Sequence, residues 1–201
     1  MLERASLFLC LVCVTLAGQT QSGWQLSKEK NGIKIYTKKA DSSSFKAIKV
    51  ECVFEGTWER LAAILMDIKL QEQWVYRSKK AYAIKKISEN EILYYTETSL
   101  PWPISHRDAV VRMKLYYDPA SKMNRVLSVN EPKVLPEKKG LIRIQHYKAT
   151  WEVKPVEKNK IAITYFLEVD PAGSLPAWVV NMFITTGPYE TFAKLAELLK
   201  K

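Results

Sequence analysis

The chain has 201 residues, 47% of them hydrophobic, and a formal net charge of +10 at pH 7. This length suits one domain with a well-buried core and leaves little room for a second. A basic balance suits contact with anionic membranes or nucleic acid but says nothing about the fold. Beyond the first residues the only cysteine is Cys52, which excludes an internal disulfide and a thiol-rich metal site there.

The N-terminal segment has the features of a secretory signal peptide. Arg4 precedes an apolar run over residues 7–16, and small residues follow it. Because a membrane-spanning helix needs roughly 20 apolar residues, this run is too short to cross a bilayer comfortably. We expect a signal peptide over residues 1–22, with an uncleaved anchor as the alternative. We also expect an exported protein, periplasmic or secreted, with one domain over residues 23–201.

The first elements of this domain are predicted to be two strands and a short helix. Apolar and polar side chains alternate over residues 33–37 and 45–54, the pattern of antiparallel strands. Thr57 can cap a helix from Trp58 to Met66, whose apolar residues share one helical face. We expect this helix to pack on the sheet.

Further strands are predicted in the middle of the chain. They span residues 81–87, 92–98, 109–117, 125–130, 141–153 and 160–169, with turn residues between them. Within residues 141–153 the apolar positions change phase, so we expect a β-bulge near Gln145 and His146.

Alternating side chains show which face of these strands is apolar. Apolar residues occupy every second position in the strands at 109–117 and 160–169, whereas Arg112, Lys114 and Glu168 lie on the opposite faces. The sheet is therefore predicted to be apolar within and polar outside. The expected inward-facing residues are Val111, Met113, Leu115, Tyr117, Tyr147, Trp151, Ile163, Tyr165 and Leu167.

The longest predicted helix closes the chain, over residues 174–200. Pro176 stands in its first turn, where the missing N–H costs nothing, and apolar residues form a broad stripe along it. Pro188 would clash with the carbonyl group of Ile184, which predicts a kink or local opening there. A curved antiparallel sheet around one apolar helix is an α+β fold.

Two motifs resemble the START (steroidogenic acute regulatory protein-related lipid transfer) domain family. The segment PWPISHRDAV, residues 101–110, is similar to the signature in which a proline-rich loop leads into an Arg-Asp pair and an apolar strand. The segment DPAGSLPAWVVN, residues 170–181, is similar to the end of the family's last strand and the start of its lid helix. Trp74 also lies where the family commonly has a tryptophan. The resemblance runs from about Trp24 to the C-terminus.

The resemblance implies a helix-grip fold, as in START and Bet v 1-like proteins, whose sheet and C-terminal helix enclose a hydrophobic cavity. It implies a lipid ligand, such as a phospholipid, sterol or sphingolipid, and no cofactor. Met182 and Phe183 would line the cavity with the inward-facing residues. Met113 occupies the position where some sterol-binding relatives have a cavity arginine, which disfavours that polar anchor. A gate in contact with the membrane would consist of Leu100, Trp102, Pro103, Ile104, Leu175, Pro176 and Trp178.

The adjacent charges Arg107 and Asp108 have two interpretations. They could contact a lipid headgroup, or they could hold a loop by ion pairing or capping. Charged neighbours at the start of a strand more often serve the second purpose, so we expect them to be loop anchors.

Three functions are compared on these grounds. The favoured one is a monomeric lipid carrier that makes transient contact with an anionic membrane. The alternative is a cyclase- or aromatase-like enzyme acting on a hydrophobic substrate. It would need polar residues in the cavity, where the predicted faces offer mainly the Tyr117 and Tyr165 hydroxyls. Nucleic-acid binding is not expected, because the aromatic residues fall on predicted buried faces. The histidines, His106 and His146, lack partners at metal-ligand spacing.

Overall fold

The computed structural model describes residues 23–39, 46–173 and 175–201. Within these residues ten strands form one sheet in the order β1-β2-β3-β10-β9-β7-β6-β5-β4, with β8 paired to β6 off this path. The expected signal peptide, the first residue of the strand expected from Phe45, and the expected helix start at Ser174 lie outside the described residues. The strands are β1 (Gln25–Lys30), β2 (Ile33–Lys39), β3 (Lys46–Glu55), β4 (Ser78–Ser88), β5 (Glu91–Thr98), β6 (His106–Asp118), β7 (Met123–Asn130), β8 (Leu141–Arg143), β9 (His146–Glu157) and β10 (Lys160–Asp170).

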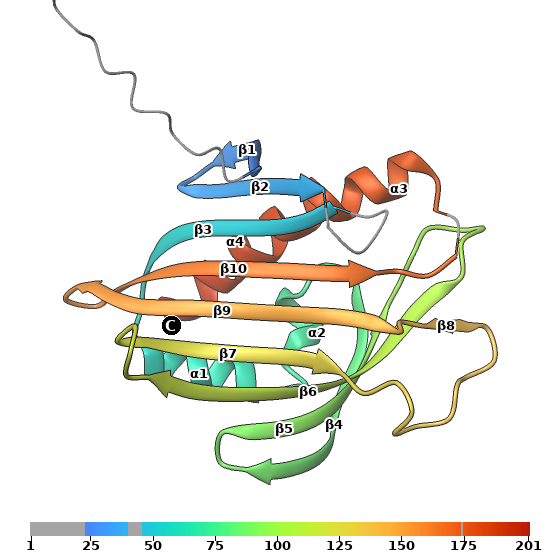
Figure 1. The fold of residues 1–201 in the computed structure, drawn as a ribbon, viewed down its shortest axis with the longest axis horizontal. Helices are drawn as coiled ribbons and strands as arrows, with labels where there is room; N and C mark the ends of the chain where they lie inside the picture. Colours follow the sequence, from blue (N-terminus) through green and yellow to red (C-terminus); the bar gives the residue numbers. More distant parts are fainter. Residues whose placement is uncertain (1–22, 40–45, 174) are drawn as a thin grey trace, which may run out of the picture.

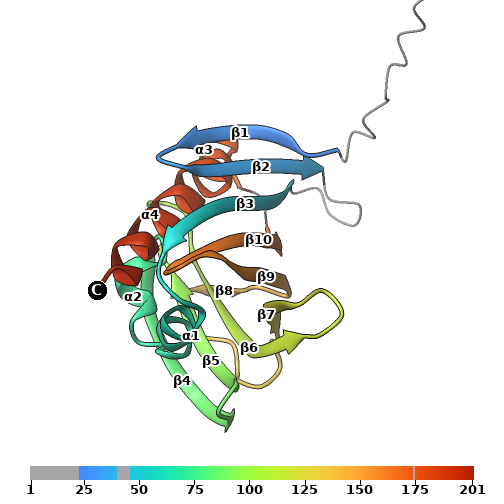
Figure 2. The same ribbon diagram turned by 90° about the vertical axis from the view of Figure 1, so that its left-hand side faces the viewer.

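The sheet is antiparallel except where β8 meets β6, and it curls around the helices (Figures 1 and 2). Strands β1 to β3 lie at one edge of the sheet. The chain then crosses to the other edge of the sheet through the helices α1 (Trp58–Met66) and α2 (Gln71–Trp74). It then returns strand by strand until β10 pairs with β3. This is the predicted α+β helix-grip arrangement.

The expected β-bulge near Gln145 is a break between two strands. β8 pairs with β6, whereas β9 begins at His146 and pairs with β7 and β10. The Asn130 side chain holds this break, because its amide donates to the Gln145 carbonyl group at 2.6 Å and its oxygen accepts from the Tyr147 N–H at 3.0 Å. A change of partner strand produces the same phase shift in the sequence as a bulge.

The first helix forms where it was predicted. The Thr57 hydroxyl accepts from the backbone N–H of Arg60 at 3.3 Å, as an N-cap does. Leu61, Ile64 and Leu65 are buried against the sheet. The short helix α2 follows and buries Trp74.

The C-terminal helix consists of α3 (Ala177–Asn181), a π-helical turn η1 (Met182–Thr186) and α4 (Gly187–Leu199). The Gly187 N–H bonds to the Met182 carbonyl group, five residues earlier. Pro188 follows directly and has no N–H to donate. The predicted local opening beside Pro188 is therefore confirmed as a π-helical turn.

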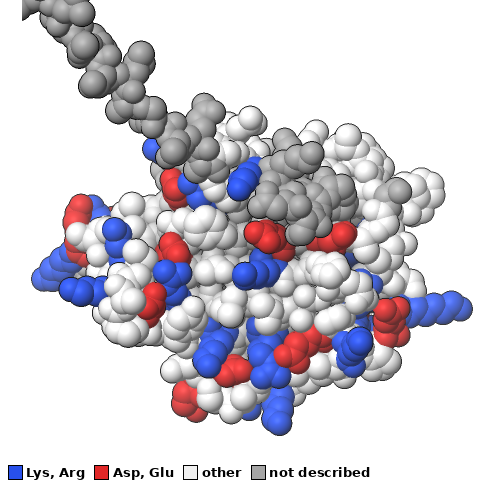
Figure 3. Space-filling model, in the orientation of Figure 1, with Lys and Arg blue, Asp and Glu red and all other residues white. Residues whose placement is uncertain are grey.

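The outer face of the sheet is polar. Figure 3 views this face and shows basic and acidic side chains intermixed across it. Ion pairs join neighbouring strands, among them Arg125 with Glu152 at 2.6 Å and Arg112 with Glu91 at 3.1 Å. This polar surface is the counterpart of the predicted apolar interior.

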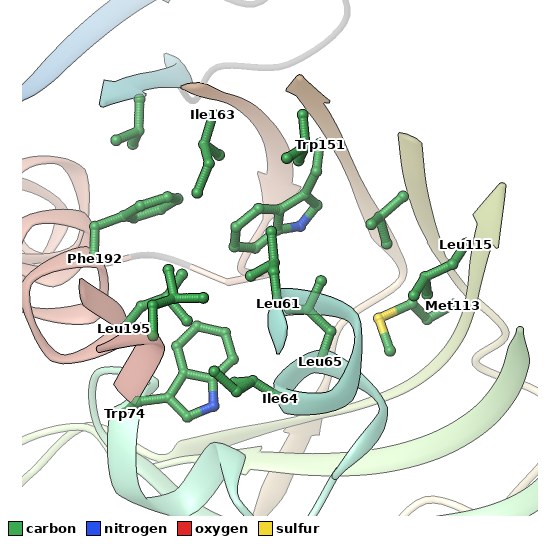
Figure 4. Packing of buried hydrophobic residues seen from close by; sticks show 14 of the residues in the cluster. Leu61, Ile64, Leu65, Trp74, Met113, Leu115, Trp151, Ile163, Phe192 and Leu195 are labelled. Carbon is green, nitrogen blue, oxygen red and sulfur yellow. The ribbon is translucent and has the colours of Figure 1, made fainter. Parts of the chain in front are cut away.

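The hydrophobic core lies between the inner face of the sheet, α1 and α4 (Figure 4). Phe192 of α4 stacks on Trp151 of β9 with ring centroids 5.3 Å apart and meets Tyr165 of β10 at 5.5 Å. Trp74 packs in the same cluster. These aromatic contacts fix α4 against the middle of the sheet.

Candidate functional site

The helices cover the inner face of the sheet unevenly. Among the expected lining residues, Val111, Met113, Leu115, Trp151 and Ile163 are buried in the core. A second set lies at or near the end of the sheet where β6 and β9 begin and β10 ends, together with the π-helical turn, and is only half-buried: Tyr147, Tyr165, Leu167, Met182 and Phe183. Apolar surface between the sheet and η1 is therefore incompletely covered by the protein itself.

Tyr117 was predicted to line the interior, but the structure does not place it there. It is 58% exposed. The Leu115 N–H bonds to the Asn90 carbonyl group at the turn before β5, and the pairing of β5 with β6 ends at Lys114. Tyr117 thus lies in the part of β6 that extends beyond β5 and pairs only with β7. Its place in the alternation of the strand therefore does not put its side chain on a covered face.

Two buried polar residues in this interior, Gln71 of α2 and Tyr94 of β5, were not predicted as site residues. Gln71 lies beside the Tyr94 hydroxyl. Burial, reinforced by neighbouring tyrosines, raises the pKa values of Tyr94, Tyr147 and Tyr165 well above the ordinary value. These hydroxyls therefore keep their protons at neutral pH and are hydrogen-bond donors. Tyr94 is two residues after Ile92, so the alternation of β5 places it on the same inward face and could have identified it. Gln71 lies on a helix too short for a periodic pattern to identify it.

The two segments expected to form a gate carry exposed aromatic residues. Trp102, in the loop between β5 and β6, is 92% exposed, and Trp178 of α3 is 54% exposed. Pro103 and Pro176 are also exposed, and Ile104 and Leu175 are half-buried. These six positions are compatible with contact at a surface outside the protein.

Leu100 was also expected in the gate, but unlike the other six residues it is not at the surface. It is buried, and its N–H donates to Nδ1 of His106 at 3.0 Å. This bond closes the base of the loop that carries Trp102. Leu100 therefore anchors the loop, and in this structure it cannot contact a membrane.

Arg107 joins the two gate segments. Its Nε donates to the Pro171 carbonyl group at 3.0 Å and its Nη2 to that of Ala172 at 2.9 Å, both in the connection from β10 to α3. Its Nη1 donates to the carbonyl group of Ser105 in the loop before β6. One buried guanidinium thus holds the Trp102 loop beside the start of the C-terminal helix.

Asp108 points to the opposite face of β6 and forms a buried ion pair with Arg143. Two hydrogen bonds of 2.8 and 2.9 Å join them, and both side chains are 1% exposed. Arg143 also donates to the carbonyl groups of Pro132, Leu135 and Pro136. Arg107 and Asp108 therefore both hold loops, in the way expected for residues at the start of a strand.

Other reactive groups offer little chemistry at this site. Burial raises the pKa of the Cys52 thiol, which keeps it protonated and unreactive. Among residues 23–39, 46–173 and 175–201, no three His, Cys, Asp or Glu side chains gather as metal ligands would. Within the same ranges, no helix is both long and apolar enough to span a bilayer.

Comparison with known proteins identifies the family. The sequence pattern of the START domain matches residues 9–201, and the chain belongs to the START domain family. It is 31% identical to the phosphatidylcholine transfer protein of Bos taurus over 87% of this chain and 84% of that protein. An uncharacterized protein of Pseudomonas aeruginosa is 26% identical over 89% of this chain and 87% of its own length.

Solved structures show the same fold. A STAR-related lipid transfer protein from Xanthomonas axonopodis superimposes with a TM-score of 0.80 and 27% identity, covering 89% of this chain and 99% of that one. Human StAR-related lipid transfer protein 5 superimposes with a TM-score of 0.78 and 21% identity, covering 90% of this chain and 88% of that one.

Proposed function

We propose that this protein binds one lipid between the sheet and the C-terminal helix and transfers it between membranes. The observation that carries the proposal is the incompletely covered apolar surface around Tyr165, Leu167 and Phe183, in an interior that is otherwise closely packed. Apolar surface of this kind is stabilised when a ligand covers it. Relatives named for phosphatidylcholine transfer and for StAR-related lipid transfer support the same function.

A carrier of this kind acts by removing an unfavourable step. Moving a single 16-carbon acyl chain into water costs on the order of 12 kcal/mol, at about 0.8 kcal/mol per CH₂, so unassisted exchange between membranes is extremely slow. An apolar interior about as favourable as the bilayer removes most of that cost. No covalent chemistry is required of the protein.

The entrance in this proposal lies between the Trp102 loop and α3. Trp102 and Trp178 are exposed on two segments that Arg107 holds together. An exposed indole suits the interface between water and membrane because one edge is polar and the rest is apolar. Opening would separate these two segments, with the π-helical turn of η1 as the flexible point.

Attraction to an anionic membrane would come from the net charge of +10. On the outer face of the sheet, basic and acidic side chains are intermixed (Figure 3). A basic side chain close to such a surface contributes about 1 kcal/mol. In this proposal the protein acts as an exported monomer and binds no nucleic acid.

Substitution of Trp102 tests the entrance. Trp102→Ala is expected to slow lipid transfer between vesicles at least about fivefold, because the indole no longer enters the membrane interface. The melting temperature should stay within about 2 °C, because the side chain is 92% exposed. Transfer of a fluorescent phosphatidylcholine from donor to acceptor vesicles measures the rate.

The matched control is Tyr117→Ala, which removes another exposed aromatic side chain at the opposite end of β6. This variant should transfer lipid at the unaltered rate. Equal rates for the Trp102 variant and the unaltered protein, or equal losses in both variants, would contradict the proposed entrance.

A further inference from the structure

A second hydrophobic cluster lies on the outer face of the sheet, apart from the main core. Leu93 and Tyr95 of β5 and Val110 of β6 are buried in it. Tyr82 and Ile84 of β4, the strand at the edge of the sheet (Figure 2), pack against them. The rings of Tyr82 and Tyr95 stack with centroids 5.0 Å apart. Because successive side chains of a strand point to opposite faces, this cluster is separated from the proposed lipid site by the sheet.

The connection between β7 and β8, residues 131–140, covers part of this cluster and is held in a fixed position. Its Leu135 packs on the cluster. The buried Arg143 donates to three carbonyl groups of the connection, at 2.7, 2.9 and 3.2 Å. Pro132 and Pro136 restrict the backbone further, because proline fixes its own φ angle. The surface of this connection is therefore preformed, which lowers the entropy that binding would cost.

Two lysines border the cluster. The Nζ atom of Lys80 lies 5.7 Å from the ring centroid of Tyr82. The Nζ atom of Lys138 lies 5.8 Å from the same centroid and 3.7 Å from that of Tyr95. Contact with an aromatic ring is favourable for an ammonium group, but it leaves the positive charge in place.

The carboxylates close to Lys80 are bound to other groups. Glu97 pairs with Lys79 at 3.2 Å. Glu72 pairs with Lys69 at 2.6 Å and also accepts from a backbone N–H of β4. Across the part of the chain that the structure describes, neither lysine that borders the cluster forms an ion pair. The surface around the stacked tyrosines is therefore basic without a local acidic partner.

Apolar surface is exposed on the same connection. Val134 is 42% exposed, and it lines a shallow hollow together with Glu131, Pro132 and the exposed Lys133. The Glu131 carboxylate accepts from the Arg112 guanidinium, so it does not neutralise the nearby lysines. Basic and apolar groups thus occur together on this part of the molecule. We call it the basic surface, and it consists of Lys80, Tyr82, Lys133, Val134 and Lys138.

We propose that the basic surface is a docking site for a partner protein whose contact segment carries carboxylates on both sides of an apolar side chain. The carboxylates would pair with the lysines, and the apolar side chain would cover Val134 and the accessible part of Tyr82. Charges at the rim of such a contact guide the partner to the surface and select it by sign. Because the basic surface lies outside the lipid site, the proposal does not depend on lipid binding.

Two other occupants fit the basic surface less well. A second copy of the chain carries the same lysines in the same place, and with a net charge of +10 two copies repel each other. A membrane favours aromatic side chains that project from the protein, as Trp102 does at 92% exposed. On the basic surface the rings stack on each other instead. A protein of opposite charge is therefore the favoured occupant.

Selection from a displayed library of random peptides tests the chemistry of the partner. Peptides are selected for binding to the unaltered protein and against binding to the double variant Lys80→Glu with Lys138→Glu. The peptides that remain should be rich in Asp and Glu around an apolar residue. They should bind the unaltered protein at least about tenfold more tightly than the double variant, because two attractions become two repulsions. Calorimetric titration with the synthetic peptides measures both affinities.

The matched control is Lys148→Glu with Lys154→Glu, which makes the same change of charge at exposed lysines of β9, away from the cluster. This control should bind the peptides within about twofold of the unaltered protein. Val134→Ser should weaken binding severalfold without a change of charge. Selection that yields no peptide able to distinguish the unaltered protein from the double variant would overturn the inference. Equal weakening in the β9 control would also overturn it.

Vesicles containing phosphatidylserine separate a protein partner from a membrane. The double variant and the β9 control should lose vesicle binding to the same extent, because both change the net charge equally. A loss confined to the double variant would overturn the assignment to a protein and indicate a membrane surface. Both variants should still bind lipid, so a failure of the proposed lipid transfer is distinguishable from a failure of this inference.

Discussion

Two neighbouring residues on β6 hold different parts of the molecule because a strand directs successive side chains to opposite faces. Arg107 reaches the connection between β10 and α3 on the inner face, whereas Asp108 reaches Arg143 beneath the loop that precedes β8. The sequence motif shows that two charges stand together, but it does not show that their partners lie on opposite faces. Those partners come from distant parts of the chain.

The ion pair of Asp108 and Arg143 leads to a stability prediction. Arg143→Met leaves a buried carboxylate without its partner, which should lower the free energy of unfolding by about 3–5 kcal/mol. Urea unfolding followed by circular dichroism measures the loss. The double variant Asp108→Asn with Arg143→Met should lose less than the sum of the two single variants, because it leaves no buried charge. Additive losses would show that the two side chains act independently.

At the scale of elements, the C-terminal helix has two different parts on either side of Pro188. The α4 part is fixed by Phe192, which is buried against Trp151 and Tyr165. The η1 part carries Phe183, which is half-buried and meets Tyr76 edge-on at 5.7 Å. The π-helical turn lies between the fixed part and α3. In the proposed function it is the point at which the end of the helix that carries α3 would move while the core stays packed.

Two substitutions on this helix separate the roles. Phe192→Ala should lower the free energy of unfolding by about 3–5 kcal/mol, because it opens a cavity in the core. Phe183→Ala should lower it by about 1 kcal/mol, in keeping with its partial burial, and should weaken lipid binding severalfold. Urea unfolding and a vesicle-binding assay measure the two effects. A similar loss of stability for both variants would contradict the division of the helix.

The elements that could be predicted from the sequence are mainly those in which apolar residues recur at a regular spacing. Strands with alternating apolar residues, the Thr57-capped helix and the opening beside Pro188 follow from local patterns. β1 was not predicted, because its residues are mostly exposed and show little alternation. The phase change before β9 indicates a bulge when only the sequence is considered, because a change of partner strand and a bulge shift the phase in the same way. Tyr117 and Leu100 were misplaced because their burial depends on neighbouring strands and loops.

At the scale of the whole molecule, the proposed function requires an interior that a bound lipid completes. The sheet, α1 and α4 form a closely packed core at one end, and the other end leaves apolar surface half-covered beside the proposed entrance. In the proposed function, a lipid that covers this surface would stabilise the folded state. Composition and periodicity cannot show this division, because both ends have the same apolar pattern in the sequence.

Native mass spectrometry of the protein, purified without added lipid, tests this claim most directly. We expect a bound species of lipid mass at a ratio of one to one, and organic extraction should recover that lipid. A mass equal to that of the protein alone, unchanged after incubation with vesicles of mixed phospholipids, would contradict it.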